Sequence, residues 1–149
     1  MSLTVCLRNE GVLVESAPKI YIRADGQTKE ISREEWDALY PGREPVVMLP
    51  EPTDVIYEAN ITHNLARMSV EADLYAPLWE PTESLGVTCA GDLIPHLVKG
   101  LKILKSDRSK FEVFNPVNGW GSYDDLISFV SNYISACSLN PTSTISVSR

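Results

Sequence analysis

The sequence has little cysteine and no long apolar run. Its three cysteines, Cys6, Cys89 and Cys137, are an odd number with no CxxC spacing, which argues against a disulfide framework and against a structural zinc site. No stretch approaches the ~18 apolar residues of a membrane-spanning helix. The start, MSLTVCLRNE, lacks the basic leader and long apolar stretch of a secretory signal. We therefore expect a cytoplasmic protein with reduced thiols and no membrane partner.

The common catalytic motifs are also missing. The chain contains no Walker loop and no G-x-G-x-x-G, H-E-x-x-H or G-x-S-x-G sequence. Cys89 lies near an expected helix start, where the helix dipole lowers a thiol pKa, and His63 or His96 is then a candidate base. Nothing in the spacing brings these residues together, and Asp92 with His96 is a two-ligand pair of a kind that is common by chance. The sequence predicts no catalytic residue, metal or cofactor.

Positive charge is scarce in the first half of the chain. The net charge is −7, and residues 1–75 contain 7 Lys and Arg against 13 Asp and Glu. Broad nucleic-acid binding depends on neutralising phosphates, so it is not expected. In the second half Lys99, Lys102 and Lys105 form a stripe, for which a solvated surface is the commoner explanation. The alternatives are a phosphate-bearing ligand, if the stripe converges with Arg108 and the asparagines, or an acidic partner such as a second copy of the chain in a homodimer.

The first third of the chain is rich in strand-like segments. Four segments have this character: residues 3–9, 19–31, 45–50 and 53–59. Asp25-Gly26 favours a tight hairpin turn within the second segment, and the prolines around the last two predict short edge strands or extended connections. Residues 32–40 predict a short helix that Ser32 caps, with Glu35 completing a capping box.

From Asn60 the apolar spacing becomes helical. One apolar stripe recurs over about four turns, at Ile61, Leu65, Met68, Ala72 and Tyr75. This helix is expected to end before Pro77. A second helix is expected to begin near Asp92, because Pro95 then falls in its first turn. Its apolar face consists of Leu93, Leu97, Leu101 and Leu104.

Three further elements complete the chain. A short helical piece follows Ser106 as its cap, Ser122 and Asp125 resemble the cap of a long last helix, and residues 143–149 return as a terminal strand. We therefore predict a single α+β domain over residues 1–149, with a β-rich portion at 1–56 and a mainly helical portion at 57–149. The expected architecture is a small, mostly antiparallel sheet packed against about three main helices.

The segment YEANITHN forms the first of two polar clusters. Asn60 or Thr62 is a natural N-cap, which would place His63 and Asn64 in the first turn of the helix. A junction between strand and helix is the commoner explanation for such residues. The functional alternative is a pocket for an anionic or amide-bearing ligand at the helix N-terminus.

The segment FNPVNGWGSYDD forms the second cluster. Gly119 and Gly121 permit backbone angles closed to other residues, and Asn118-Gly119 is a strong turn dipeptide, so a defined loop is expected around Trp120. Trp120 is either a plug over the core, which is the commoner outcome, or a stacking platform for a base or a sugar.

Together the two clusters resemble a group of small uncharacterised proteins from phages and bacterial genomes, over the part of the chain from about Asn60 to the end. An N-x-T-x-N segment and an N-G-W-G-x-Y loop recur together in that group. They match two sets of residues here: Asn60, Thr62 and Asn64, and Asn118, Gly119, Trp120, Gly121 and Tyr123. The resemblance implies that the two clusters face each other.

We predict a non-enzymatic binding or interaction protein, such as a phage or prophage accessory factor that sequesters a ligand or a host protein. The alternative is a binding protein or enzyme for a nucleotide or phosphometabolite. Its candidate site residues are Asn60, Thr62, His63, Asn64, Asn118, Trp120 and Tyr123. A ligand site requires them to line one concave pocket, whereas an interaction protein would bury them in junction hydrogen bonds and expose an apolar patch elsewhere.

Overall fold

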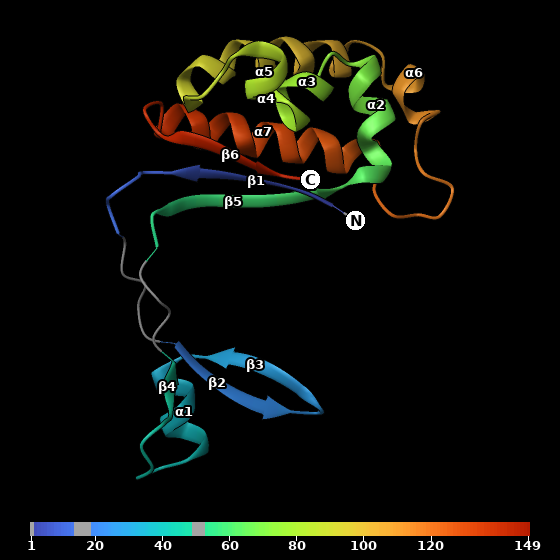
Figure 1. The fold of residues 1–149 in the computed structure, drawn as a ribbon. Coiled ribbons are helices and arrows are strands. Elements are labelled where there is room, and N and C mark those ends of the chain that lie inside the picture. Colours follow the sequence, from blue (N-terminus) through green and yellow to red (C-terminus); the bar gives the residue numbers. More distant parts are fainter. Residues whose placement is uncertain (1, 14–18, 49–52) are drawn as a thin grey trace. The chain divides into compact units, whose positions relative to one another are not determined.

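The structure is a computed structural model that describes residues 2–13, 19–48 and 53–149. It confirms the α+β class. The chain forms two compact units: Met1–Val12 packs with Asp54–Arg149, and Leu13–Thr53 forms a second unit inserted between them (Figure 1). We call the first the main unit and the second the insert.

The main unit contains a three-stranded antiparallel sheet. Its strands are β1 (Ser2–Arg8), β5 (Val55–Thr62) and β6 (Thr144–Ser148), in the order β5-β1-β6. Side chains alternate between the two faces of a strand, and Leu3, Val5 and Leu7 of β1 are fully buried on the face that the helices cover (Figure 1). Both strand pairs of this sheet join residues far apart in sequence, and the terminal strand predicted at the end of the chain is confirmed as β6.

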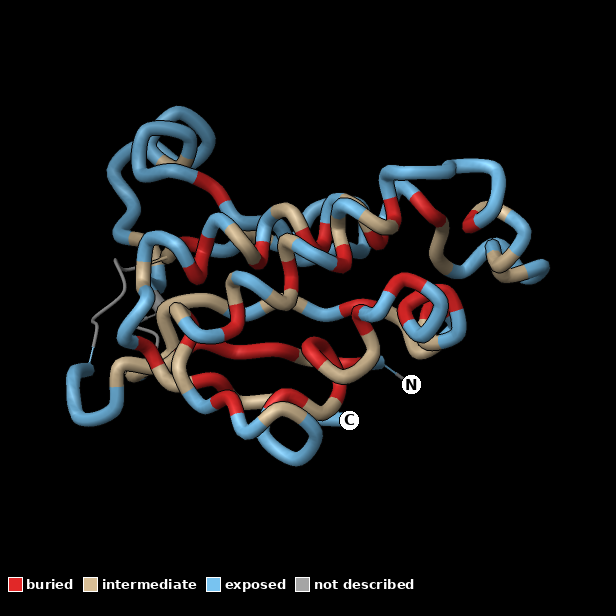
Figure 2. Tube along the Cα trace, turned by 90° about the horizontal axis from the view of Figure 1, so that it is seen from above, coloured by how far each residue is buried: buried red, intermediate tan, exposed pale blue. Residues whose placement is uncertain are grey.

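Helices cover that one face. In chain order they are η1 (His63–Leu65), α2 (Ala66–Glu71), α3 (Tyr75–Trp79), α4 (Pro81–Leu85), α5 (Ala90–Ser106), α6 (Arg108–Glu112) and α7 (Tyr123–Leu139). Buried positions recur along α5 and α7 at helical spacing (Figure 2), so these two long helices and the sheet enclose the core. None of the described helices is long and apolar enough to cross a membrane.

The helix predicted from Asn60 is wrong at both ends. Residues Asn60 and Thr62 belong to β5, where they pair with Thr4 and Ser2, so tertiary pairing overrides the local helical spacing. The helical stretch also breaks at Asp73, whose φ of 56° is left-handed, and a new helix, α3, contains Pro77 in its first turn. Proline is tolerated there because the first helical amides need no partner within the helix.

Two other predicted helix boundaries are corrected. Helix α5 begins at Ala90, two residues before Asp92, where the Ala90 N–H donates to the Ser143 carbonyl (2.9 Å) outside the helix. Pro95 therefore lies inside the helix and not, as predicted, in its first turn. Asp107, and not Ser106, caps α6 by accepting from the Lys110 N–H (3.2 Å).

The long C-terminal helix is confirmed. The Ser122 hydroxyl accepts from the Asp125 N–H (3.2 Å) and caps α7, as its sequence predicts. Its apolar face is buried at Leu126, Phe129, Val130, Tyr133 and Cys137.

The insert has its own antiparallel sheet, so the strands of the first third do not all join one sheet. Strands β2 (Lys19–Ala24), β3 (Gln27–Ile31) and β4 (Val47–Met48) lie in the order β3-β2-β4, with α1 (Arg33–Leu39) after β3. The Asp25-Gly26 hairpin turn and the Ser32 cap are confirmed, since Asp25 and Gly26 have φ of 53° and 76° and Ser32 accepts from the Glu35 N–H. Of the strand predicted at 45–50, residues 49 and 50 lie outside the described residues.

Candidate functional site

The loop between α6 and α7 is folded by asparagine side chains. Asn115 Oδ1 accepts from the Tyr123 N–H (2.8 Å), and Asn118 Oδ1 accepts from the Trp120 N–H (3.0 Å). Short amide side chains that bond the backbone a few residues on stabilise such turns. The left-handed angles at Gly119 and Gly121, with φ of 75° and 99°, complete the loop.

The other cluster lies where β5 ends. The Thr62 hydroxyl accepts from the Asn64 N–H (3.2 Å) and caps η1, which confirms Thr62 as a capping residue. Asn60 is not a cap, because it lies two residues earlier within the strand. Since side chains alternate along a strand, Asn60 and Thr62 both point to the sheet face opposite the buried Ile61.

The two clusters meet. Asn64 Nδ2 donates to the Trp120 carbonyl (3.3 Å), across 56 positions of sequence. Gly121 lies so close to Thr62 that a Cβ there would be 2.6 Å from Thr62 Cγ2, so only glycine permits this approach. The loop is therefore held directly against the end of β5.

This contact leaves a concave surface that we call the Trp120 groove. Its cavity volume is about 470 Å³, and it is lined by Ser2, Asn60, Thr62, Asn64, Asn118 and Trp120. The Trp120 side chain is 73% exposed, so the interpretation of Trp120 as a plug over the core is wrong. A large exposed ring beside amide and hydroxyl groups is suited to stacking on a flat ligand while the polar groups form hydrogen bonds.

Two of the predicted site residues do not line this groove. Tyr123 is only 3% exposed, and its hydroxyl donates to the Leu104 carbonyl (2.7 Å), so it anchors the loop to α5. Its burial raises the pKa of the phenol above its ordinary value. His63 is half-buried, and its ring centroid lies 6.2 Å from that of Trp79 in α3.

A second groove, which the sequence did not reveal, lies between β5 and α7. We call it the edge groove. It has a cavity volume of about 430 Å³ and is lined by Tyr57, Ala59, Asn60, Ile61, Thr62, Leu65, Gly121, Asp125, Phe129 and Asn132. Asn60, Thr62 and Gly121 belong to the two polar clusters, but the sequence indicates nothing that joins them to Asn132 or Phe129, and it predicts Phe129 only as part of an apolar helix face.

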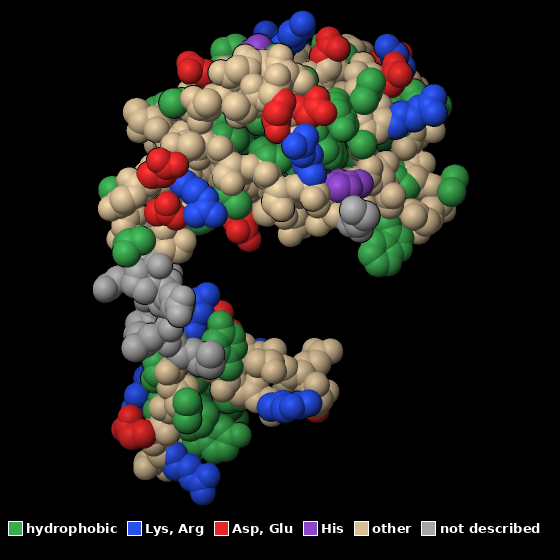
Figure 3. Space-filling model, in the orientation of Figure 1, with side chains coloured by type: hydrophobic (Ala, Val, Ile, Leu, Met, Phe, Trp, Pro, Cys, Tyr) green, Lys and Arg blue, Asp and Glu red, His purple; other side chains and the backbone are tan. Residues whose placement is uncertain are grey.

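The lysine stripe does not converge with the asparagines. Lys99 Nζ lies 3.9 Å from an Asp73 carboxylate oxygen, and Arg108 donates to both carboxylate oxygens of Asp124 (2.8 and 2.9 Å). On the face of the main unit seen in Figure 3, lysine and arginine side chains lie among aspartate and glutamate side chains. None of the stripe's lysines lines the Trp120 groove, so its described lining is uncharged.

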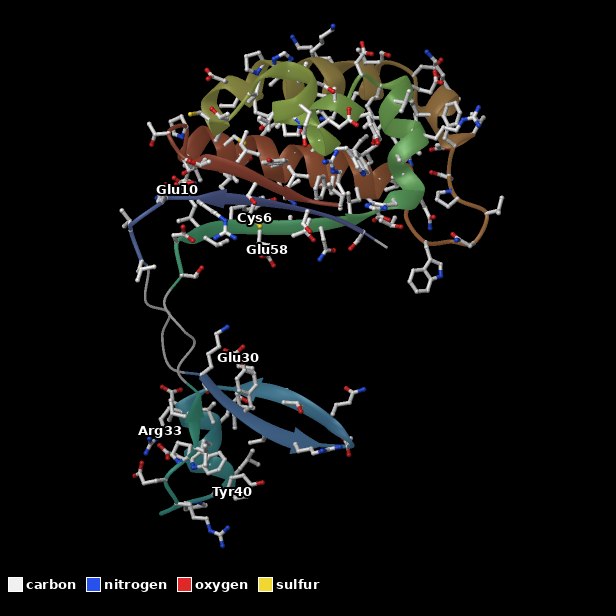
Figure 4. The ribbon with its side chains drawn as sticks, in the orientation of Figure 1. Cys6, Glu10, Glu30, Arg33, Tyr40 and Glu58 are labelled. Carbon is white, nitrogen blue, oxygen red and sulfur yellow. The ribbon has the colours of Figure 1, made fainter. Side chains whose placement is uncertain are left out.

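Two of the three cysteines, Cys6 and Cys137, are buried thiols, and Cys89 is half-buried. Burial raises the pKa of Cys137 to about 12. Burial, followed by the hydrogen bond to Glu58, also raises the pKa of the Cys6 thiol, which lies beside Glu58 on the neighbouring strand (Figure 4). No cluster of three or more His, Cys, Asp or Glu side chains suited to a metal ion occurs among the described residues.

The chain was compared with known proteins in three ways. No protein-family model, no curated protein and no solved structure matches it.

Proposed function

We propose that the protein is a non-enzymatic binding protein and that the Trp120 groove is its recognition site. The observation that carries this proposal is the contact between Asn64 and Trp120, which joins two distant polar clusters in one concave surface. Five of the seven candidate residues line that surface, as a ligand site requires.

The groove is suited to a ligand with a flat ring and polar substituents, such as a nucleoside or a sugar. The exposed Trp120 ring offers a stacking surface, and stacking on an aromatic side chain contributes roughly 1–3 kcal/mol per base. Asn60, Thr62, Asn64 and Asn118 supply amide and hydroxyl groups that donate and accept hydrogen bonds. Because these groups are uncharged, recognition by shape and hydrogen bonding is favoured over recognition of a strongly anionic group.

The wider setting is also a proposal. A cytoplasmic location is supported by three unpaired cysteines. A role as a phage or prophage accessory factor rests on the resemblance carried by the N-x-T-x-N and N-G-W-G-x-Y segments. Sequestration of the bound ligand needs no chemistry beyond binding itself.

The test is a fluorescence titration with a panel of nucleosides and monosaccharides, because Trp120 is the most exposed of the three tryptophans, whereas Trp36 is half-buried and Trp79 is buried. We expect at least one compound to change the emission of the wild-type protein. Trp120→Ala should weaken its binding roughly 5- to 150-fold, measured by calorimetry. The matched control is Val117→Ala, which removes a fully exposed apolar side chain from the same loop without touching the groove.

Asn64→Ala should weaken the same ligand by roughly 2- to 10-fold, because it removes one amide and releases the loop from β5. The proposal is wrong if no compound in the panel binds, or if Trp120→Ala binds as tightly as Val117→Ala.

A further inference from the structure

One edge of the main sheet is covered by another segment of the chain, and the other edge borders a groove. At the β6 edge, the Ile145 N–H donates to the Thr88 carbonyl (2.9 Å), and Thr144 forms an isolated bridge with Cys89, so the segment before α5 covers that edge. At the other edge, β5 pairs with β1 alone among the described strands, and its outer side borders the edge groove. An edge strand that opens onto a groove is a template for a further strand.

The hydrogen bond of Ile145 at the β6 edge shows which residues of β1 direct their N–H and C=O groups toward β5. Because the Ile145 N–H points away from β1, its pair with Leu7 is of the non-hydrogen-bonded kind. Leu7 therefore directs its own N–H and C=O toward β5, where it faces Tyr57. The hydrogen bond from the Asn9 N–H to the Asp54 carbonyl (2.9 Å), two residues further along the same strand direction, agrees with this assignment.

The same alternation runs along β5. Hydrogen-bonded pairs recur at every second residue of an antiparallel ladder, so Ala59 and Ile61, like Tyr57, direct their N–H and C=O groups toward β1. Glu58 and Asn60 then direct their N–H and C=O groups to the outer edge. A register shift between Leu7 and Arg8 distorts the start of β5, so the regular part of this open edge begins at residue 57.

The edge groove provides a place for side chains of an added strand. Ala59 and Ile61 line it from the strand, and Leu65 and Phe129 line it from the helices. These four residues are apolar, and a cavity of about 430 Å³ accommodates aliphatic side chains that follow one another at every second position.

The charges of this region favour a basic partner. Asp125 lines the edge groove and Glu58 lies on the open edge, and neither carboxylate forms an ion pair with any described residue. No lysine or arginine is among the described residues that line the groove. The net charge of −7 acts in the same direction.

We propose that the outer edge of β5 binds an extended, basic polypeptide segment, which adds to the sheet as a fourth strand. The main chain of the segment bonds to Glu58 and Asn60, its alternate apolar side chains enter the edge groove, and its basic side chains lie on the open face of the sheet beside Glu58. This goes beyond the proposed function, because it concerns the main chain of β5 and does not require Trp120.

The first test varies the ligand. The probe is a terminally blocked peptide of alternating lysine and valine, matched to the eight residues of β5, and its binding is measured by calorimetry. In an antiparallel added strand, residues opposite Glu58 and Asn60 place their side chains on the open face, so lysine amides face β5. We expect N-methylation of the lysine amides to abolish binding and N-methylation of the valine amides to be tolerated. A peptide with glutamate in place of lysine should bind at least tenfold more weakly.

The second test varies the protein. Glu58→Pro removes the outward N–H while leaving the ladder to β1 intact, and proline is tolerated at edge positions of this kind. It should weaken the lysine-valine peptide about tenfold or more. Glu58→Ala is the matched control, because it removes the same carboxylate and keeps the N–H, and it should bind more tightly than Glu58→Pro. Both variants should keep the thermal unfolding and the ligand-dependent fluorescence of the Trp120 groove.

The outcomes separate the two proposals. Loss of peptide binding in Glu58→Pro but not in Trp120→Ala supports strand addition. Strand addition is overturned if the wild-type protein does not bind the peptide. It is also overturned if N-methylation of the lysine amides and N-methylation of the valine amides weaken binding equally. The comparison of the two methylated peptides uses the wild-type protein, so it remains decisive if Glu58→Pro fails to fold. Neither result changes the fluorescence titration, so the Trp120 groove is judged on its own.

Discussion

The main unit and the insert differ in how much core they bury. In the main unit, apolar residues from three strands and the helices form one continuous buried cluster, with Leu3, Leu97 and Tyr133 fully buried. In the described part of the insert, Ile20 and Ile31 are the buried apolar residues, and α1 has none. A unit of this size rarely stabilises itself without a disulfide, a metal or a partner. The main unit is therefore expected to fold on its own core, and both grooves lie on it.

The insert occupies the place of a hairpin turn. Strands β1 and β5 are antiparallel neighbours, with Arg8 opposite Val55 and the Asn9 N–H bonded to the Asp54 carbonyl. Antiparallel strands need only about two residues to connect them. The fold of the main unit thus does not depend on what joins these two strands.

The largest expected effect on stability comes from truncating a buried side chain in the core of the main unit. Leu97→Ala removes a fully buried side chain of α5 and should lower the free energy of unfolding by about 2–5 kcal/mol. Leu39→Ala, in the exposed part of α1, should change it by less than about 0.5 kcal/mol. Denaturant titration measures both. If Leu39→Ala lowered the free energy of unfolding as much as Leu97→Ala, the insert would contribute as much buried core as the main unit, and the difference between the two units would be wrong.

A smaller effect is expected where the loop meets β5. Gly119→Ala should cost about 1–2 kcal/mol, because a left-handed angle disfavours any Cβ while the space around it is empty. Gly121→Ala should cost more, because its Cβ also collides with Thr62, and it should remove ligand binding by displacing the loop. If Gly121→Ala is no worse than Gly119→Ala in thermal unfolding, the close approach is not needed for the groove.

Replacement of residues 13–53 by a short Asn-Gly turn tests the independence of the main unit. The shortened chain should fold and should gain up to about 2 kcal/mol, because each halving of a connecting loop saves roughly 0.6 kcal/mol of closure entropy. Circular dichroism and thermal unfolding report the outcome. A shortened chain that does not fold would show that the insert contributes to the main core.

The smallest effect concerns the ion pair that joins α6 to α7. Hydrogen bonds from Arg108 hold the pKa of Asp124 below its ordinary value. Its contribution is therefore complete above the ordinary aspartate pKa of about 3.9 and is lost as the pH falls through the lowered pKa. Asp124→Asn should unfold slightly earlier than wild type at pH 7 and low salt, and the difference should vanish in strong acid. A difference that persists there would rule out this carboxylate as the cause.

Local signals in the sequence predicted local structure well. The Ser32 and Ser122 caps and the Asp25-Gly26 turn depend on residues within a few positions of each other, so the sequence sufficed for them. The end of β5 was missed because Asn60 and Thr62 take their conformation from pairing with β1, far away in sequence.

The candidate site was predicted only in part, because its residues are brought together by contacts between distant parts of the sequence. The residue types in the two clusters marked them as candidates, and the resemblance implied that they face each other. Their contact, through Asn64 and Trp120, spans 56 positions and is visible only in the fold. The edge groove was not predicted as a groove, although Asn60 and Thr62 were candidate residues, because Asp125 and Asn132, which line it from α7, are separated from β5 by a long stretch of chain.

The central claim is that the two polar clusters act as one recognition site. Its most direct test is a two-dimensional NMR map of the backbone and side-chain amides, recorded while the tightest compound of the nucleoside and monosaccharide panel is added. We predict that Asn60, Asn64, Asn118 and Trp120 shift together along one binding curve. Shifts confined to one cluster, or centred on the separate cavity beside His96 and Lys99, would contradict the claim.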